Sequence, residues 1–159
     1  MYRSEWLLQQ MQAVGQIIAR ILGLRQQGQN QEAEQVTEEA YRAYGLISRE
    51  LARAATADSL VTMLRLRQAL PEHYAMLGEI LEVESRMRLA DGDRSGGLHY
   101  AHKALRAYLE AILDSPEEFF DTYVPRVVAL EEFFDDSEVE LSAQTEERLD
   151  ELLALENRS

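Results

Sequence analysis

Two stretches, GQNQEAEQVTEEA at residues 28–40 and GDRSGGLHYAHKA at residues 92–104, share the spacing that decides the fold. In each stretch a turn glycine is followed five and twelve positions later by a residue with little or no side chain: Gly28, Ala33 and Ala40, then Gly92, Gly97 and Ala104. Small residues seven positions apart lie on nearly the same helix face, where a neighbouring helix can approach closely. The repeated spacing therefore predicts two helical hairpins.

Apolar residues at helical spacing extend the first hairpin on both sides of its turn. The helix before Gly28 is predicted over residues 5–27, and the helix after the turn over residues 31–44, ending at Gly45. The buried stripe of the first helix is formed by Leu7, Met11, Val14, Ile18 and Ile21, and it is widened by Trp6. Because so short a turn joins antiparallel neighbours, residues 1–45 are predicted to form the first hairpin.

The same pattern predicts a second hairpin over residues 71–113, which opens with Pro71 at the first position of a helix. Residues 46–70 form an irregular helical insert between the hairpins, without the small-residue spacing. Residues 114–159 form acidic, aromatic C-terminal helices, and Pro125 is expected to kink or split the first of them. We therefore predict one all-α domain in which antiparallel helical hairpins stack as a degenerate array of about seven helices.

The segment from Phe119 to Phe134 is the most aromatic part of the chain. It contains Phe119, Phe120, Tyr123, Phe133 and Phe134. These side chains either close the end of the helical stack, as a capping element does, or form an interface with a partner or with a second copy in a homodimer. A segment this apolar is prone to aggregation when uncovered, which favours the capping interpretation.

The amino-acid composition of the chain favours one globular domain and excludes several kinds of site. The chain has 159 residues, of which 46% are hydrophobic, which suits a single domain with a packed core. It has no cysteine, which excludes disulfides, thiolate metal sites and a cysteine nucleophile. Arg3 and Glu5 interrupt the opening residues, and no apolar run reaches membrane-spanning length, so we expect a cytoplasmic protein.

The net charge of -13 is unevenly distributed. Residues 1–112 carry 13 basic and 14 acidic side chains, whereas residues 113–159 carry 3 and 15. The acidic C-terminal part repels the phosphate backbone of nucleic acids, and no cluster of arginine and aromatic residues offsets that repulsion. We therefore expect no nucleic-acid partner and no binding to an anionic membrane surface.

The two hairpins resemble tetratricopeptide repeats, which use the same succession of a turn glycine and two small residues. Each matches over about 34 residues, roughly 14–47 and 78–111, and Ser85 adds a small residue seven positions before Gly92. Neither repeat ends in proline, and Ile21 replaces the small residue in the first. Residues 1–113 are also similar to a family of small bacterial helical proteins of unknown function, through the opening helix MYRSEWLLQQMQAVGQIIARILGL and both hairpins.

The tetratricopeptide resemblance implies recognition of a peptide or protein on a concave face lined by the first helix of each hairpin. The corresponding positions are Ile18, Leu22, Arg25, Gln26, Glu79, Glu82 and Arg86. The lysine and asparagine residues that clamp a terminal carboxylate in some such repeats are absent from these positions. The alternative is that Ile18 and Leu22 are core residues and that the charged residues form solvated pairs on a helix surface.

Candidate catalytic or metal-binding residues are few. His99 and His102 are three positions apart, a spacing at which two imidazoles on one helix can share a divalent metal, and Asp91 or Asp93 would add oxygen ligands. Because the sequence has no HExxH motif and no third histidine nearby, surface histidines on a polar helix face are the alternative. No phosphate-binding glycine loop or nucleophile elbow occurs in the sequence, and no cofactor is predicted.

The sequence leaves two functional hypotheses. The first is a non-enzymatic interaction or scaffold module of tetratricopeptide-like type, with a protein or peptide partner. The second is a small-molecule or metal-dependent enzyme that uses the helical groove. The second hypothesis predicts a pocket in which histidines or acids with shifted pKa values converge.

Overall fold

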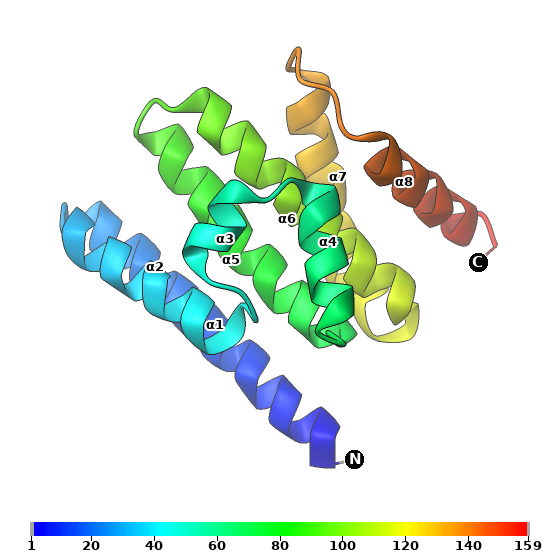
Figure 1. The fold of residues 1–159 in the computed structure, drawn as a ribbon, viewed down its shortest axis with the longest axis horizontal. Coiled ribbons are helices and arrows are strands. Elements are labelled where there is room, and N and C mark those ends of the chain that lie inside the picture. The colour runs from blue at the N-terminus through cyan, green and yellow to red at the C-terminus, as the bar shows by residue number, and fades with distance from the viewer. Residues whose placement is uncertain (1, 159) are drawn as a thin grey trace.

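The computed structural model describes residues 2–158, with side chains from Glu5 to Arg158. Within that range the chain forms eight helices and no strand, which confirms the predicted all-α class (Figure 1). The helices are α1 (Tyr2–Gln26), α2 (Asn30–Tyr44), α3 (Arg49–Ala54), α4 (Ala57–Leu66), α5 (Pro71–Ala90), α6 (Arg94–Asp114), α7 (Pro116–Asp135) and α8 (Ala143–Glu156). No helix in the described range is long and apolar enough to cross a membrane.

The turn glycines end the first helix of each hairpin and the small residues are buried, as their spacing predicts. Gly28 has a φ of 77° and Gly92 a φ of 81°, in the left-handed region that a residue without Cβ adopts freely. The three alanines of the spacing are fully buried. In the second hairpin, the Ser85 hydroxyl of α5 donates a hydrogen bond of 2.7 Å to the Gly97 carbonyl of α6. The two helices of that hairpin therefore approach closely at this point.

The two hairpins pack directly on each other. Helix α1 contacts α2 and α5, so the first helices of the two hairpins are neighbours. The insert of residues 46–70 does not separate them, because α3 contacts α2 while α4 contacts α6 and α8 (Figure 1). The irregular insert therefore leaves a continuous face between α1 and α5.

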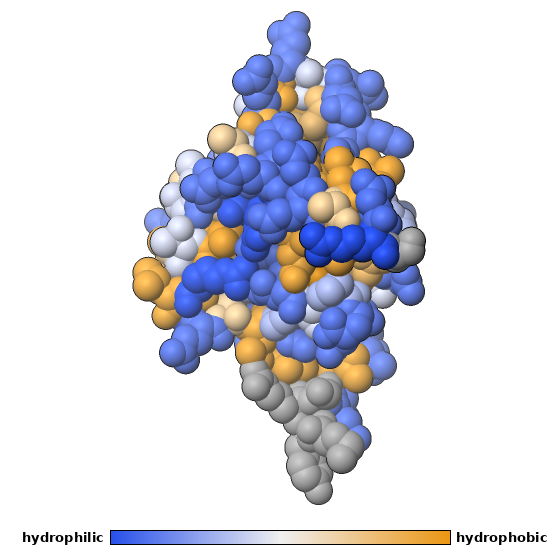
Figure 2. Space-filling view, turned by 90° about the vertical axis from the view of Figure 1, so that its right-hand side faces the viewer, coloured by the Kyte–Doolittle hydropathy of each residue, from blue (hydrophilic) through white to orange (hydrophobic). Residues whose placement is uncertain are grey.

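The aromatic segment closes the core against α6. Phe119, Tyr123 and Phe134 are 5%, 2% and 4% exposed and belong to the main hydrophobic core. Tyr123 stacks on Tyr108 of α6 with ring centroids 5.0 Å apart. On the side of the molecule shown in Figure 2, hydrophobic residues form separate patches among hydrophilic ones. The burial of the aromatic side chains supports the capping interpretation.

The structure corrects two local expectations, that Pro125 splits its helix and that Trp6 is buried. Helix α7 continues from Pro116 to Asp135 with Pro125 inside it, so this proline does not split the helix. Pro125 and Asp121 both lie on the exposed face, where water can bind the Asp121 carbonyl that lacks an amide partner. Trp6 is 56% exposed, although its position predicted burial. Helix α1 has 25 residues and α2 only 15, so the first turns of α1 extend past the helix that would cover them.

Candidate functional site

The seven predicted binding residues lie together between α1 and α5. They line two hollows, which we call the larger and the smaller hollow of the α1–α5 groove. The larger hollow, of about 520 Å³, is lined by Leu22, Arg25, Gln26, Asn30, Arg86, Met87 and Ala90. The smaller hollow, of about 130 Å³, is lined by Gly15, Ile18, Glu79, Glu82, Val83, Arg86 and Arg126. Because Arg86 lines both, the two hollows adjoin.

The larger hollow combines apolar side chains with two guanidinium groups. Arg25 lies 2.5 Å from the Asp91 carboxylate and donates a hydrogen bond of 3.3 Å to the Met87 carbonyl, so it ties the end of α1 to the end of α5. The Arg86 side chain is 58% exposed and lies 3.3 Å from the Glu82 carboxylate. Among the described residues, no carboxylate lines this hollow. Its volume falls in the range of about 300–1,000 Å³ that is typical of ligand sites.

The smaller hollow is bordered by Arg126 of α7. The Arg126 guanidinium donates hydrogen bonds of 3.1 Å to Glu79 and 3.0 Å to the Tyr108 hydroxyl, and it lies 3.7 Å from Glu82. The Tyr108 hydroxyl donates a hydrogen bond of 2.6 Å to Glu82. Burial raises the pKa of Glu79, and the positive charge of Arg126 opposes that rise. Both carboxylates of the hollow are therefore held by protein donors.

Arg126 is a groove residue that the repeat pattern does not identify. It lies 47 positions from Glu79 in the sequence and outside both hairpins. Its one sequence signal is that it is the sole basic residue of PEEFFDTYVPRVVALEEFF, residues 116–134. A single cation in an acidic, aromatic helix indicates a specific acidic partner, but it does not say which carboxylate that is.

A buried ion pair supports α5 from the side opposite the groove. Arg49 of α3 donates hydrogen bonds of 2.6 and 3.2 Å to the two carboxylate oxygens of Glu84, which is fully buried. Arg49 also lies 2.6 Å from the Glu34 carboxylate of α2. Because Glu84 lies between Glu82 and Arg86 in the sequence of α5, this pair fixes the helix that carries those two groove residues.

A second buried cluster is centred on Glu110 of α6, which is 1% exposed. Its carboxylate accepts hydrogen bonds of 2.5 Å from Arg65 of α4, 3.1 Å from Arg106 of α6 and 2.7 Å from Arg148 of α8. Burial raises the pKa of Glu110, but the hydrogen bonds from Arg148 and Arg65 outweigh burial and lower the pKa to about 2. One carboxylate thus joins three helices.

The two candidate metal-binding histidines have different partners. His99 Nε2 lies 3.1 Å from the Arg53 carbonyl, and His102 Nε2 lies 3.0 Å from the Thr145 hydroxyl. Burial lowers the pKa of His102. Within the part of the chain that is described, no group of three or more histidine, aspartate or glutamate side chains is arranged to hold a metal ion. The geometry therefore adds no support to the metal hypothesis.

The α1–α5 groove is the part of the structure from which we infer a function. It collects every residue that the repeat resemblance selects, and it joins them to Arg126 from a third helix. Neither the protein-family models, nor the curated proteins, nor the solved structures compared with this chain include a match.

Proposed function

We propose that this protein is a non-enzymatic interaction module of tetratricopeptide-like type, which binds a peptide segment of a partner protein in the α1–α5 groove. One observation carries the proposal: all seven residues that the repeat pattern selects line two hollows joined at Arg86. Extended concave faces of this kind are the binding surfaces of stacked helical repeats. The direct contact of α1 with α5 supports such a face here.

The lining of the larger hollow favours a peptide that carries an apolar side chain next to an acidic one. Leu22 and Ala90 provide accessible apolar contact, and burying an apolar anchor gains about 25 cal/mol per Å². Arg86 provides a cation whose only close carboxylate among the described side chains is that of Glu82, at 3.3 Å. A peptide carboxylate on Arg86 forms a charge-assisted hydrogen bond, which is stronger than a neutral one.

The enzyme alternative has less support. Glu79 and Glu82 do converge in the smaller hollow, but its volume of about 130 Å³ is small for a substrate. Both carboxylates are also occupied, Glu79 by Arg126 and Glu82 by Tyr108. A general acid or base needs to reach a substrate proton, and the hydrogen bonds from Arg126 and Tyr108 compete with that role.

A peptide-library selection on the full-length chain tests the proposal. Enriched peptides are expected to carry an acidic residue beside a large apolar one and to bind saturably in fluorescence polarisation. Arg86→Glu is expected to weaken their binding by at least about tenfold, because attraction becomes repulsion. Arg20→Glu is the matched control, since Arg20 on α1 is 59% exposed and Arg86 is 58% exposed. That control is expected to change binding by less than about twofold.

Two outcomes would contradict the peptide proposal. The first is a selection that yields no saturable binder, or binders that tolerate Arg86→Glu. The second is a dimer in sedimentation analysis that Arg86→Glu dissociates, because a second copy of the chain would then occupy the groove.

A further inference from the structure

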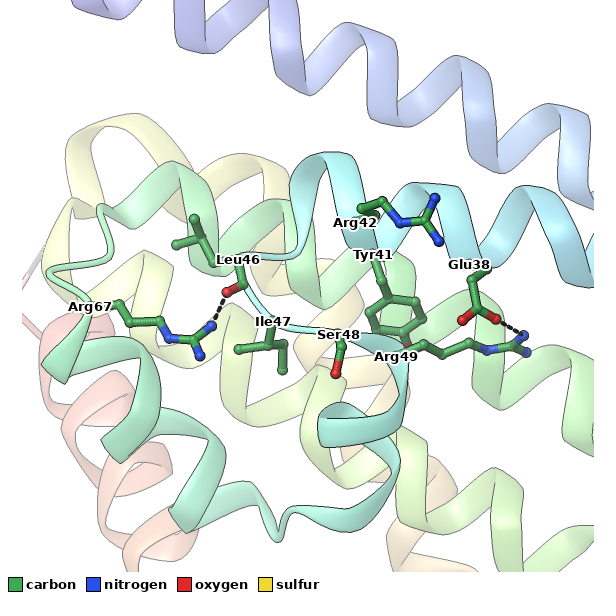
Figure 3. A pocket seen from close by; sticks show the side chains of 8 residues that line it. All are labelled: Glu38, Tyr41, Arg42, Leu46, Ile47, Ser48, Arg49 and Arg67. Atoms are coloured by element: carbon green, nitrogen blue, oxygen red, sulfur yellow. Dashed lines mark hydrogen bonds and ion pairs between the residues drawn. The ribbon is translucent and has the colours of Figure 1, made fainter.

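A separate hollow lies where the connection between α2 and α3 meets the end of α4 (Figure 3). Its volume is about 310 Å³. Three arginines line it, Arg42, Arg49 and Arg67, against one carboxylate, that of Glu38. We call it the arginine hollow. An excess of cations around one hollow is notable in a chain whose net charge is -13.

The three guanidinium groups differ in how far they are neutralised. Arg49 is 6% exposed and lies 2.6 Å from both Glu84 and Glu34, so its charge is taken up internally. Glu38 lies 3.8 Å from Arg49, on the same side of the hollow. The neutralised Arg49 therefore forms part of the wall and is not available as an anion-binding group.

Arg42 and Arg67 keep donors that no protein carboxylate uses. Arg67 donates a hydrogen bond to the Leu46 backbone carbonyl, which is uncharged. The Arg42 side chain has no hydrogen bond or ion pair with any side chain in the described range. Figure 3 places Arg67 at one side of the hollow and Arg42 at the other. An anion entering from solvent therefore meets available guanidinium groups at both sides.

The shape of the hollow is fixed by two loops under backbone strain. Leu46 and Gln68 are the non-glycine residues with positive φ in the described chain, at 60° and 57°. Arg67 precedes Gln68 and reaches the Leu46 carbonyl, so its side chain joins the two strained loops. A Cβ on Gly45 would lie 2.9 Å from the Tyr41 carbonyl, so this turn is also folded tightly onto α2. Strained backbone held by its surroundings is typical of binding sites.

The middle of the hollow is apolar. In Figure 3, Ile47, Ser48 and the Tyr41 ring lie between the flanking arginines, and Leu46 lies beside Arg67. Tyr41 is 1% exposed and Ile47 is 3% exposed, so both form the floor of the hollow, whereas Leu46 is 38% exposed and supplies accessible apolar surface. An inorganic anion would leave this apolar surface unused, whereas an organic anion would cover it.

We propose that the arginine hollow binds a small organic anion, with an apolar body against Leu46 and a carboxylate or phosphate head group on Arg42 or Arg67. Its lining residues do not overlap with those of the α1–α5 groove. The proposal for this site is therefore independent of the peptide-binding proposal.

Titration of the ¹⁵N-labelled full-length chain with three probes tests this site. The probes are benzoate, phenyl phosphate and inorganic phosphate, in a low-salt buffer without other oxyanions. Saturable shifts at residues 41–49 with benzoate or phenyl phosphate support the proposal, and their ratio identifies the preferred head group. Phenyl phosphate is expected to bind at least about fivefold more tightly than inorganic phosphate, because only its ring contacts the apolar wall.

Substitutions of opposite sign make the test specific. Arg42→Gln and Arg67→Gln are each expected to weaken binding, by about fivefold or more for the residue that holds the head group. Glu38→Gln removes the one carboxylate of the wall and is expected to tighten binding by about twofold. Arg20→Gln is the control, because Arg20 on α1 does not line the hollow, and it is expected to leave binding unchanged.

The assignment is overturned by any of three results. One is the lack of saturable shifts at the hollow with either organic probe. Another is equal binding of phenyl phosphate and inorganic phosphate. The third is binding that neither arginine substitution weakens and that Glu38→Gln does not tighten, in variants whose circular dichroism matches that of the wild type.

Discussion

Replacing Glu110 by glutamine is expected to destabilise the fold strongly, although the new side chain has nearly the same shape. Glu110 is 1% exposed and accepts hydrogen bonds from arginines of three helices. The amide keeps one oxygen acceptor but loses the negative charge. Of the carboxylates in the described part of the chain, Arg106, which is 4% exposed, then keeps only Asp58 close by, at 2.7 Å. Removing one partner from a buried ionic cluster leaves uncompensated charge in the interior.

The magnitude follows from the pKa of Glu110. Its pKa is lowered from 4.5 to about 2 in the folded protein. At roughly 1.4 kcal/mol for each pH unit, this corresponds to about 3 kcal/mol of stability at neutral pH. Because the side chain is almost completely buried, solvent screening reduces this value little. Glu110→Gln is therefore expected to lower the free energy of unfolding by about 3 kcal/mol at pH 7.

The same cluster predicts how that difference depends on pH. Because the pKa of Glu110 is lower in the folded chain, the unfolded chain takes up the proton first as the pH falls. The contribution of Glu110 is complete above pH 4.5 and is lost as the pH falls towards about 2. The difference in stability between the wild type and Glu110→Gln is therefore expected to shrink over that interval.

Urea unfolding at several pH values measures this difference. Glu151→Gln is the matched control, because Glu151 also pairs with Arg148, at 2.5 Å, but is 52% exposed. The control is expected to lower stability by at most about 1 kcal/mol. A loss below about 1 kcal/mol for Glu110→Gln at pH 7, or a difference that stays constant down to about pH 3, would refute the reasoning.

Two further substitutions probe helix packing and buried charge. Gly78→Ala places a Cβ 2.6 Å from the Tyr108 ring, whose position is fixed by stacking, and is expected to lower the free energy of unfolding by about 1–3 kcal/mol. The added Cβ of Gly97→Ala meets the side chain of Leu89, which is 36% exposed and can move. In the same urea assay, Gly97→Ala is therefore expected to lower the free energy of unfolding less than Gly78→Ala does. The reverse order would contradict this view of the α5–α6 contact. Burial lowers the pKa of Lys103 to about 8, so the folded chain releases this proton before the unfolded chain does. The stability of the wild type relative to Lys103→Met is therefore expected to rise between about pH 8 and pH 10, and a difference independent of pH would show that the ammonium group is not desolvated.

The parts of the fold that the sequence predicts well are the two hairpins, because their signals lie close together in the chain. The hairpins follow from glycines at positive φ and from small residues on one helix face, and both features depend on residues close together in the chain. The groove residues come from the resemblance to tetratricopeptide repeats, which selects one face of the first helix of each hairpin, and their role in binding stays a prediction. The capping role of the aromatic segment is one of two alternatives, and the burial of Phe119 and Phe134 supports it.

The sequence does not predict which acidic and basic side chains form ion pairs between distant parts of the chain. The pairs Arg49–Glu84 and Arg65–Glu110 join residues 35 and 45 positions apart. With 29 acidic and 16 basic side chains in the chain, very many pairings compete, and no periodicity selects the correct ones. The position of Arg126 in the groove is not predicted for the same reason. The exposure of Trp6 likewise depends on where α2 ends, which the residues of α1 do not encode.

The most direct test of the proposed binding face is chemical-shift mapping of a library-selected peptide on the ¹⁵N-labelled full-length chain. The largest changes are expected at the amides of residues 18–26 and 79–86, and they are expected to disappear in Arg86→Glu. Changes confined to α8 or to the arginine hollow, with residues 18–26 and 79–86 unaffected, would contradict binding in the α1–α5 groove.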